Sequence, residues 1–174
     1  MITEKEFLET ELKMGISFDN PAFIALANQT AEQIKGLGVT VMDYGAGTGV
    51  YADAYHKAGF DILIWEKFNS HKEYIKEKAP HLVIIDKPIT TDIMSFIEVA
   101  EHMTDKELNS LFKKIKPNYI LFSSTSQKTD NDLEWGHINI KEQAEWDSYF
   151  KGIGYDIYKH LSIPTEWAKI YKLN

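Results

Sequence analysis

A glycine-rich stretch constrains the fold of this chain more than any other feature. The motif DYGAGTG, residues 43–49, places three glycines within five residues directly after an apolar run. A second apolar run, residues 60–65, ends in the carboxylate of Glu66. Because glycine has no Cβ, glycines at this spacing let a backbone turn tightly and approach a ligand closely. The stretch therefore predicts a strand, a ligand-binding turn, a helix and a second strand, in that order.

Apolar runs and amphipathic segments alternate through the rest of the chain. The apolar runs that predict strands are residues 39–43, 60–66, 81–86, 93–97 and 119–125. The segments that predict helices are residues 3–13, 21–34, 50–58, 69–78, 105–116 and 140–151, with a polar loop at 126–136. Residues 154–174 alternate apolar and polar side chains, which predicts an antiparallel hairpin. The pattern favours the α/β class, with a mostly parallel sheet, an antiparallel edge and helices on both faces.

Helix-start signals and length set the expected domain organisation. Asn20 before Pro21 is typical of an N-cap followed by the first helical position, and Thr104 with Glu107 forms a capping-box pattern. A chain of 174 residues fits one domain with a continuous core. We expect a single domain over residues 1–174, with helices in residues 1–36 and a ligand-binding core in residues 37–174.

Composition narrows the classes of partner. All 19 basic residues are lysine, the formal net charge is −7, and the chain has no cysteine. Without arginine, bidentate recognition of phosphate is excluded, and the negative charge disfavours a nucleic-acid partner. No apolar run reaches the roughly 18 to 20 residues of a membrane span, and the acidic start does not resemble a signal peptide. We therefore expect a cytoplasmic protein that acts on a small molecule or an exposed group of a partner, away from membranes; the oligomeric state stays open.

The spacing of the glycines separates the candidate ligands. A dinucleotide fingerprint needs a glycine where Val50 stands, and a phosphate-binding P-loop needs a Gly-Lys-Ser/Thr ending that is absent. A carboxylate at the end of the second strand can accept hydrogen bonds from both hydroxyls of a ribose, which suits Glu66. Asp43 would repel phosphates but not a cationic cofactor such as S-adenosylmethionine. A purely structural glycine turn remains an alternative.

These pieces together resemble a known family. The motif DYGAGTG, the segment WEK with its acid, the stretch IMSFIEVAEHM and the segment GHINIKEQAEWDSYFKGIGY resemble class I, S-adenosylmethionine-dependent methyltransferases of the small-molecule and quinone type. The resemblance covers about three quarters of the chain. It implies a three-layer, Rossmann-like sheet of about seven strands, a transferase that leaves S-adenosylhomocysteine as product, and a substrate lid in residues 1–36. The sequence departs from many relatives in KPNYILF, which lacks a glycine pair before the fifth strand.

The resemblance also implies a cofactor site. Glu66 is expected to bind the ribose, Asp86 to lie near the adenine amino group, and Ile97 or Glu98 to lie beside the methionine portion. The predicted cofactor-binding residues are Asp43, Tyr44, Gly45, Ala46, Gly47, Thr48, Gly49, Glu66, Lys67, Asp86, Ile97 and Glu98. The remaining histidines, His56, His71, His81 and His160, are expected to be exposed and uninvolved.

Catalysis of methyl transfer consists mainly of positioning the acceptor atom, the methyl group and the sulfur in line. A base is needed only when the acceptor must lose a proton. We predict Glu98, His102 and His137 as the catalytic residues, with either histidine as the general base, and no metal. One alternative is a divalent metal bound by Glu98, Glu101, His102 and His137. Another is that the EVAEH stretch only forms the turn into the next helix.

Three functions follow from these observations. The leading hypothesis is a methyltransferase acting on a small-molecule or exposed acceptor group. The first alternative is a metal-dependent RNA 3′-end 2′-O-methyltransferase, because the acidic and histidine residues resemble that family's motif. The second is a non-catalytic module that binds S-adenosylmethionine and regulates a partner.

Overall fold

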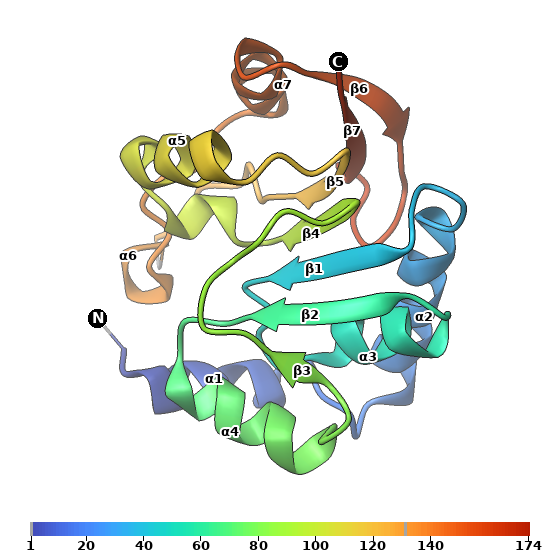
Figure 1. Ribbon diagram of the computed structural model, residues 1–174. Helices are drawn as coiled ribbons and strands as arrows, with labels where there is room; N and C mark the ends of the chain where they lie inside the picture. Colours follow the sequence, from blue (N-terminus) through green and yellow to red (C-terminus); the bar gives the residue numbers. More distant parts are fainter. Residues whose placement is uncertain (1, 131) are drawn as a thin grey trace.

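A single seven-stranded sheet organises the computed structural model, which describes residues 2–130 and 132–174 (Figure 1). The strands are β1 (Thr40–Tyr44), β2 (Asp61–Trp65), β3 (Val83–Ile84), β4 (Ile93–Ile97), β5 (Tyr119–Ser123), β6 (Tyr155–His160) and β7 (Lys169–Leu173). Their order across the sheet is β3-β2-β1-β4-β5-β7-β6. The first five strands pair in parallel, and β7 runs antiparallel to both of its neighbours.

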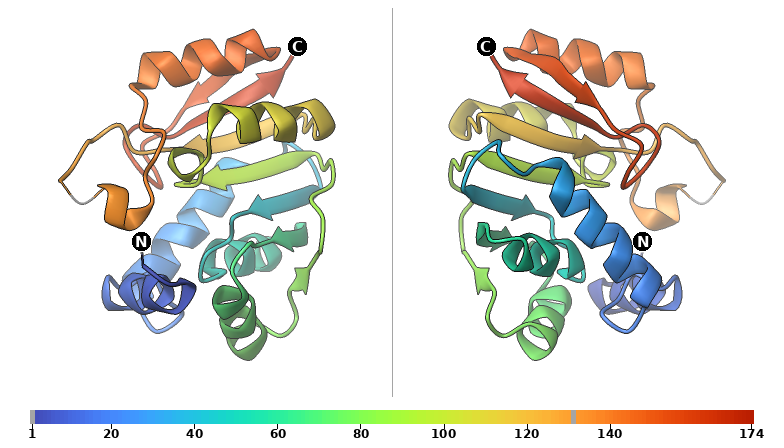
Figure 2. Two further views of the ribbon diagram at one scale, coloured as in Figure 1. Left: turned by 90° about the vertical axis from the view of Figure 1, so that its left-hand side faces the viewer. Right: turned by 90° about the vertical axis from the view of Figure 1, so that its right-hand side faces the viewer.

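Helices cover both faces of the sheet. They are α1 (Glu4–Lys13), α2 (Pro21–Gln33), α3 (Val50–Lys57), α4 (Asn69–Lys78), the 3₁₀ helix η1 (Ala100–His102), α5 (Asp105–Lys114), α6 (Asp132–Trp135) and α7 (Gln143–Gly152). Helices α5 and α7 lie on one face, and α2, α3 and α4 lie on the other, with α1 beside α4 (Figures 1 and 2). The predicted three-layer, Rossmann-like fold with an antiparallel C-terminal hairpin is confirmed.

Alternate residues of each strand build two separate cores. On β1, Val41 packs toward α2 and α3, whereas Met42 and Tyr44 pack toward α5 and α7. The second core is rich in aromatic rings, and the ring of Phe122 lies 4.8 Å from that of Phe150. Because both faces of a parallel sheet are buried, its strands read as nearly continuous apolar runs, which is why their positions were predictable from the sequence.

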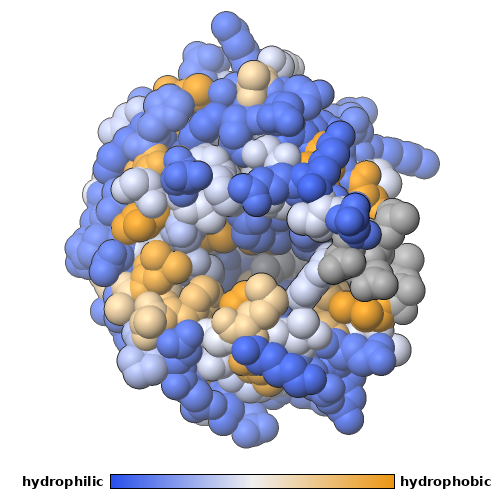
Figure 3. All heavy atoms as spheres, turned by 180° about the vertical axis from the view of Figure 1, so that it is seen from behind, coloured by the Kyte–Doolittle hydropathy of each residue, from blue (hydrophilic) through white to orange (hydrophobic). Residues whose placement is uncertain are grey.

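The face of the molecule seen from behind is mainly hydrophilic (Figure 3). On the side of the molecule seen in Figure 3, hydrophobic residues form small separate groups among hydrophilic ones. Among the residues that the structure describes, no helix is long and apolar enough to cross a membrane. The division into residues 1–36 and 37–174 stays a prediction.

The strand order sets the place of the site. Strand β1 lies between β2 and β4, so the chain connections leave β1 and β4 in opposite directions across the sheet. In open α/β sheets, ligands bind outside the carboxyl ends of the strands at this switch point. The motif DYGAGTG leaves β1 there, and the EVAEH stretch leaves β4 beside it.

Three local expectations differ from the structure. The third strand spans only Val83–Ile84, because β3 is an edge strand and pairs with β2 alone. The loop expected at 126–136 contains the short helix α6. His71, expected to be exposed and uninvolved, is buried at the start of α4, so this prediction is wrong.

Both predicted N-caps are confirmed, since Asn20 caps α2 and Thr104 forms a capping box on α5.

The carboxylate of Asp92 ties the amino ends of β1 and β4 together. Its Oδ2 accepts hydrogen bonds from the backbone N–H groups of Val39 and Thr40, at 2.8 and 2.9 Å, and from the Thr40 hydroxyl. These bonds to the charged form lower the pKa of Asp92. A Cβ at Gly38 would lie 2.4 Å from the Cβ of Asp92, so only glycine fits there.

Replacing Asp92 with alanine should lower the free energy of unfolding by about 1–3 kcal/mol, because two backbone N–H groups lose their acceptor. Asp61→Ala, at the exposed start of β2, is the matched control and should change it by less than about 0.5 kcal/mol. The folded-state pKa of Asp92 is depressed, so its stabilisation is present above the unfolded-state pKa and is lost as pH falls through the folded-state pKa. Urea unfolding at neutral and acidic pH measures both effects, and equal stability of D92A and wild type at neutral pH would contradict them.

Candidate active site

The glycine turn between β1 and α3 adopts a backbone that only glycine accommodates readily. Gly45, Gly47 and Gly49 have φ angles of 72°, 54° and 82°, in the left-handed region. A Cβ at Gly45 would lie 2.7 Å from Val99, and one at Gly49 would lie 2.8 Å from Ile75. The N–H of Gly45 donates to the carbonyl oxygen of Trp65 at 2.7 Å, which holds the turn against the end of β2.

Glu66 lies on this turn, as its place at the end of β2 predicts. Its Oε2 accepts a hydrogen bond from the N–H of Gly47 at 2.9 Å, and its Oε1 accepts one from the N–H of Phe68 at 2.8 Å. The side chain is almost fully buried. Each carboxylate oxygen has a second lone pair, so Glu66 retains the capacity to accept from two hydroxyl groups of a ligand.

Asp43, at the carboxyl end of β1, is a buried carboxyl group. Burial raises its pKa to about 7, and the charge of Glu66 adds to the shift, while a hydrogen bond from Ser95 opposes it. Its Oδ2 has no hydrogen-bond partner among the described residues. A buried oxygen without a partner is costly, which fits a group that meets a ligand's positive charge.

The other predicted cofactor residues differ in what they can contribute. Tyr44 packs its ring on Trp65 at 4.3 Å in the core, so only its backbone lines the turn, and Ala46 and Thr48 are buried. Lys67 and Asp86 are exposed after β2 and β3, and Ile97 is half-buried at the end of β4. Their roles in binding a cofactor stay predictions.

Glu98 follows β4 with a φ of 51°, the one non-glycine residue with positive φ in the described part of the chain. Its Oε1 accepts a hydrogen bond from the hydroxyl of Ser123, and its Oε2 accepts one from the N–H of Thr125 at 3.1 Å. The carboxylate therefore bridges the carboxyl ends of β4 and β5. Strained backbone of this kind concentrates at functional sites, which keeps Glu98 a candidate.

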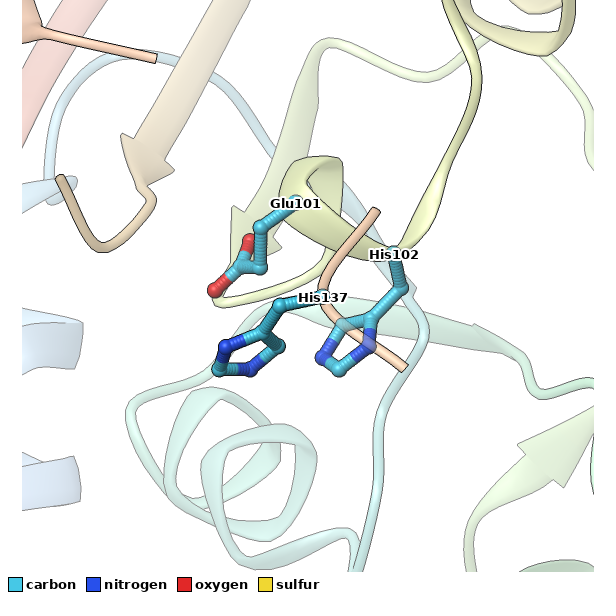
Figure 4. A group of neighbouring side chains, drawn as sticks. All are labelled: Glu101, His102 and His137. Atoms are coloured by element: carbon cyan, nitrogen blue, oxygen red, sulfur yellow. The ribbon is translucent and has the colours of Figure 1, made fainter. Parts of the chain in front are cut away.

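The side chains of Glu101, His102 and His137 lie together (Figure 4), and the carboxyl group of Glu98 is close enough to Glu101 to raise its pKa. One ligand atom from each of the three lies within 4.8 Å of the others. The rings of His102 and His137 are 4.7 Å apart. Figure 4 shows η1 supplying Glu101 and His102, and the segment after α6 supplying His137.

Burial controls the charge of this cluster. Desolvation and, as a smaller cause, the neighbouring His137 lower the pKa of His102 to about 4. Burial also raises the pKa of Glu101 well above its ordinary value, and Glu98 adds to the effect. His102 is therefore a neutral imidazole at pH 7, with Nδ1 3.3 Å from the carbonyl oxygen of Gly136.

His137 has the geometry of an oriented base. Its Nδ1 lies 3.4 Å from Oδ1 of Asp132, and the same carboxylate accepts hydrogen bonds from the N–H and hydroxyl of Thr129. An imidazole whose Nδ1 faces a carboxylate leaves Nε2 free to accept a proton. The sequence prediction did not include Asp132 or Thr129, because nothing marks their contact with His137 in the pattern of a polar loop.

The same three side chains could hold a metal ion. Two neutral imidazoles and a carboxylate are ligands that suit Mn, Fe or Zn. The alternative four-residue metal set also included Glu98, whose two oxygens each accept one hydrogen bond, from the Ser123 hydroxyl and the Thr125 N–H. Ligand atoms of Glu101, His102 and His137 meet within 4.8 Å, and Glu98 is outside that group of three.

Helix α1 covers the site. The ring of Phe7 lies about 6 Å from the rings of Phe68, His71, His102 and Trp135, so α1 links the start of α4 to the segments near the histidine cluster. The sequence prediction placed a lid in residues 1–36 without naming these contacts. Trp135 lies against Phe7. The lid as a substrate-binding element stays a prediction.

The pH dependence of folding should report on Asp43. Its folded-state pKa lies above its unfolded value, so wild type should lose more stability than Asp43→Asn as pH rises from about 4 to about 7. The difference should reach a few kcal/mol, since one pKa unit corresponds to about 1.4 kcal/mol. Urea unfolding of both proteins across this range measures it, and parallel pH profiles would contradict the burial of an ionisable Asp43.

Comparisons with known proteins agree with this geometry. A family model described as "Methyltransferase domain" matches residues 11–168. No curated protein sequence matches the chain.

Three solved structures illustrate the similarity. The mitomycin 7-O-methyltransferase MmcR is 14% identical with a TM-score of 0.61, over 89% of this chain and 55% of that one. The magnesium protoporphyrin IX methyltransferase ChlM from Synechocystis PCC 6803, with bound S-adenosylhomocysteine, is 14% identical with a TM-score of 0.60, over 85% and 81%. The methyltransferase domain of bacterial CtHen1-C is 17% identical with a TM-score of 0.63, over 85% and 96%. At these low identities, the TM-scores show a shared fold alone. The chain spans little more than half the length of MmcR.

Proposed function

The chain belongs to the methyltransferase domain family, whose model spans residues 11–168, and we propose that it transfers a methyl group from S-adenosylmethionine to a small-molecule acceptor. The membership confirms the predicted family, the class I S-adenosylmethionine-dependent methyltransferases, and with it S-adenosylmethionine as the cofactor. The acceptor and the residues that act on it are proposals. A cytoplasmic location also stays a prediction.

One observation carries the proposal of a cofactor site. The carboxylate of Glu66 and the backbone of Gly47 are joined by a hydrogen bond of 2.9 Å, so the ribose-binding acid and the glycine turn form one surface. Glu66 would hold the ribose hydroxyls there. The N–H groups at the start of α3 would hold the carboxylate of the cofactor, which requires no arginine. S-adenosylmethionine supplies an electrophilic methyl group on a positively charged sulfur.

The histidine cluster supplies the proposed base. His137, with Nδ1 facing Asp132, would take the proton of an acceptor hydroxyl at Nε2 as the oxygen bonds to the methyl carbon. His102 stays neutral because its pKa is about 4, so it can accept a hydrogen bond from the acceptor. Glu98 would keep the end of β4 in the strained conformation that borders the methionine portion.

A small molecule is the acceptor that the surroundings support. Phe7 and Trp135 supply aromatic rings beside His102, and the net charge of −7 without arginine disfavours a nucleic acid. Mitomycin 7-O-methyltransferase and magnesium protoporphyrin IX methyltransferase, which share the fold, are named for small-molecule acceptors.

A second candidate has a specific observation in its favour. The proximity of Glu101, His102 and His137 within 4.8 Å suits a metal-dependent methyltransferase, including one that acts on an RNA 3′ end. A third candidate, a regulatory module that binds S-adenosylmethionine without turnover, would use the glycine turn and leave the histidines idle. Activity and its metal dependence separate the three.

Calorimetric titration with S-adenosylhomocysteine tests the cofactor site. Wild type should bind, and Gly47→Arg should lose at least tenfold in affinity, because the side chain fills the space above the turn. Gly152→Arg, where a Cβ meets nothing within 4 Å, is the control and should bind like wild type. Circular dichroism must show that both variants are folded. Undiminished binding by G47R would contradict the assigned site.

Release of S-adenosylhomocysteine in a screen of methyl acceptors tests the base. With an accepted substrate, His137→Ala should lower kcat by about 10²- to 10⁴-fold while cofactor affinity changes less than about twofold. His160→Ala, on the exposed strand β6, is the control.

Wild-type activity should withstand a chelator. Loss of activity in chelator with recovery on adding Mn²⁺ would favour the metal-dependent alternative. Cofactor binding with no turnover in the screen would favour the regulatory module.

A further inference from the structure

A carboxylate from the N-terminal helix lies on the glycine turn, outside every motif that identifies the site. Glu11, in the last turns of α1, has Oε1 3.3 Å from the position that a Cβ would take at Gly47. The side chain is 15% exposed. The turn is therefore bordered by two carboxylates on two different elements, Glu66 at the end of β2 and Glu11 above it.

A buried histidine holds Glu11 in this place. Oε2 of Glu11 lies 2.7 Å from Nε2 of His71, whose side chain is 1% exposed. The other ring nitrogen of His71 lies 3.2 Å from the hydroxyl of Ser70, so both nitrogens have partners. The contact fixes one oxygen of Glu11 and leaves the other facing Gly47.

Helix α1 is anchored to the start of α4 by further contacts. The carboxylate of Glu4 accepts a hydrogen bond from the N–H of Asn69 at 2.9 Å, and the carbonyl oxygen of Glu4 accepts one from the Ser70 hydroxyl at 3.0 Å. The ring of Phe7 packs on those of Phe68 and His71. Glu11 is thus positioned by the fold, and its place over the turn is not that of a free surface side chain.

The chemistry of a carboxylate identifies what it would bind. S-adenosylmethionine offers hydrogen-bond donors at its ammonium group, its ribose hydroxyls and its adenine amino group. In the proposed site Glu66 would hold the ribose, and the adenine amino group would lie near Asp86, after β3. The ammonium group is the donor that remains for a carboxylate above Gly47, and it is also positively charged.

We propose that Glu11 binds the ammonium group of the cofactor, with His71 as the residue that positions it. The proposal rests on the proposed function, since it assigns one more contact in the same cofactor site. Asp43, which leads into the turn, is buried, and its Oδ2 has no hydrogen-bond partner among the residues that the structure describes.

Binding of two ligands to matched variants tests the proposal. The ligands are S-adenosylhomocysteine and its analogue in which hydrogen replaces the ammonium group, titrated by calorimetry. The variants are wild type, Glu11→Gln, which keeps size and loses charge, and Glu9→Gln, an exposed acid on the same helix. Glu11→Gln should weaken binding of S-adenosylhomocysteine about tenfold and change binding of the analogue less than twofold. Glu9→Gln should change neither.

The outcomes separate recognition from a merely structural role. Equal weakening of both ligands by Glu11→Gln would overturn the proposal, because a helix that only covers the site does not sense the ammonium group. Unchanged binding of S-adenosylhomocysteine by Glu11→Gln would overturn it too, while leaving the proposed function intact. Failure of wild type to bind S-adenosylhomocysteine would overturn both. His71→Gln should lower affinity in the same ligand-dependent way as Glu11→Gln, and a ligand-independent loss would remove His71 as the positioning residue.

Discussion

The hydrogen bonds that Glu66 accepts from the N–H groups of Gly47 and Phe68 are the contacts on which the site depends. They join the turn after β1 to the end of β2, so the glycine backbone and the Glu66 carboxylate are held together. The left-handed φ angles at Gly45, Gly47 and Gly49 make that close approach possible. A larger residue at Gly45 would meet Val99, which itself belongs to the segment that carries Glu98 and Glu101.

The sheet also brings the other candidate site residues close to this contact. Strand β4 lies beside β1, and the chain that leaves it brings Glu98, Glu101 and His102 to the same edge. The aromatic core under α5 and α7 holds that edge rigid, because Phe96 and Phe122 are fully buried between the helices and the sheet. Buried surroundings keep His102 neutral at pH 7.

Local patterns predicted most of the fold and part of the site. Apolar runs located the strands because a parallel sheet is covered on both faces, and the capping pairs located the starts of α2 and α5. Contacts between residues that are distant in the sequence could not be predicted from these local patterns. His71 resembles any polar helix residue in the sequence, yet its partner Glu11 is 60 residues earlier. The sequence also did not reveal that the Glu98 carboxylate accepts hydrogen bonds from Ser123 and Thr125, which are 25 and 27 residues later in the chain.

A crystal structure of the protein with S-adenosylhomocysteine tests the central claim most directly. The account predicts ligand density along residues 45–49, with both ribose hydroxyls within hydrogen-bond distance of Glu66. Density for the ligand elsewhere on the chain, or a ribose that does not reach Glu66 in crystals saturated with the ligand, would contradict it.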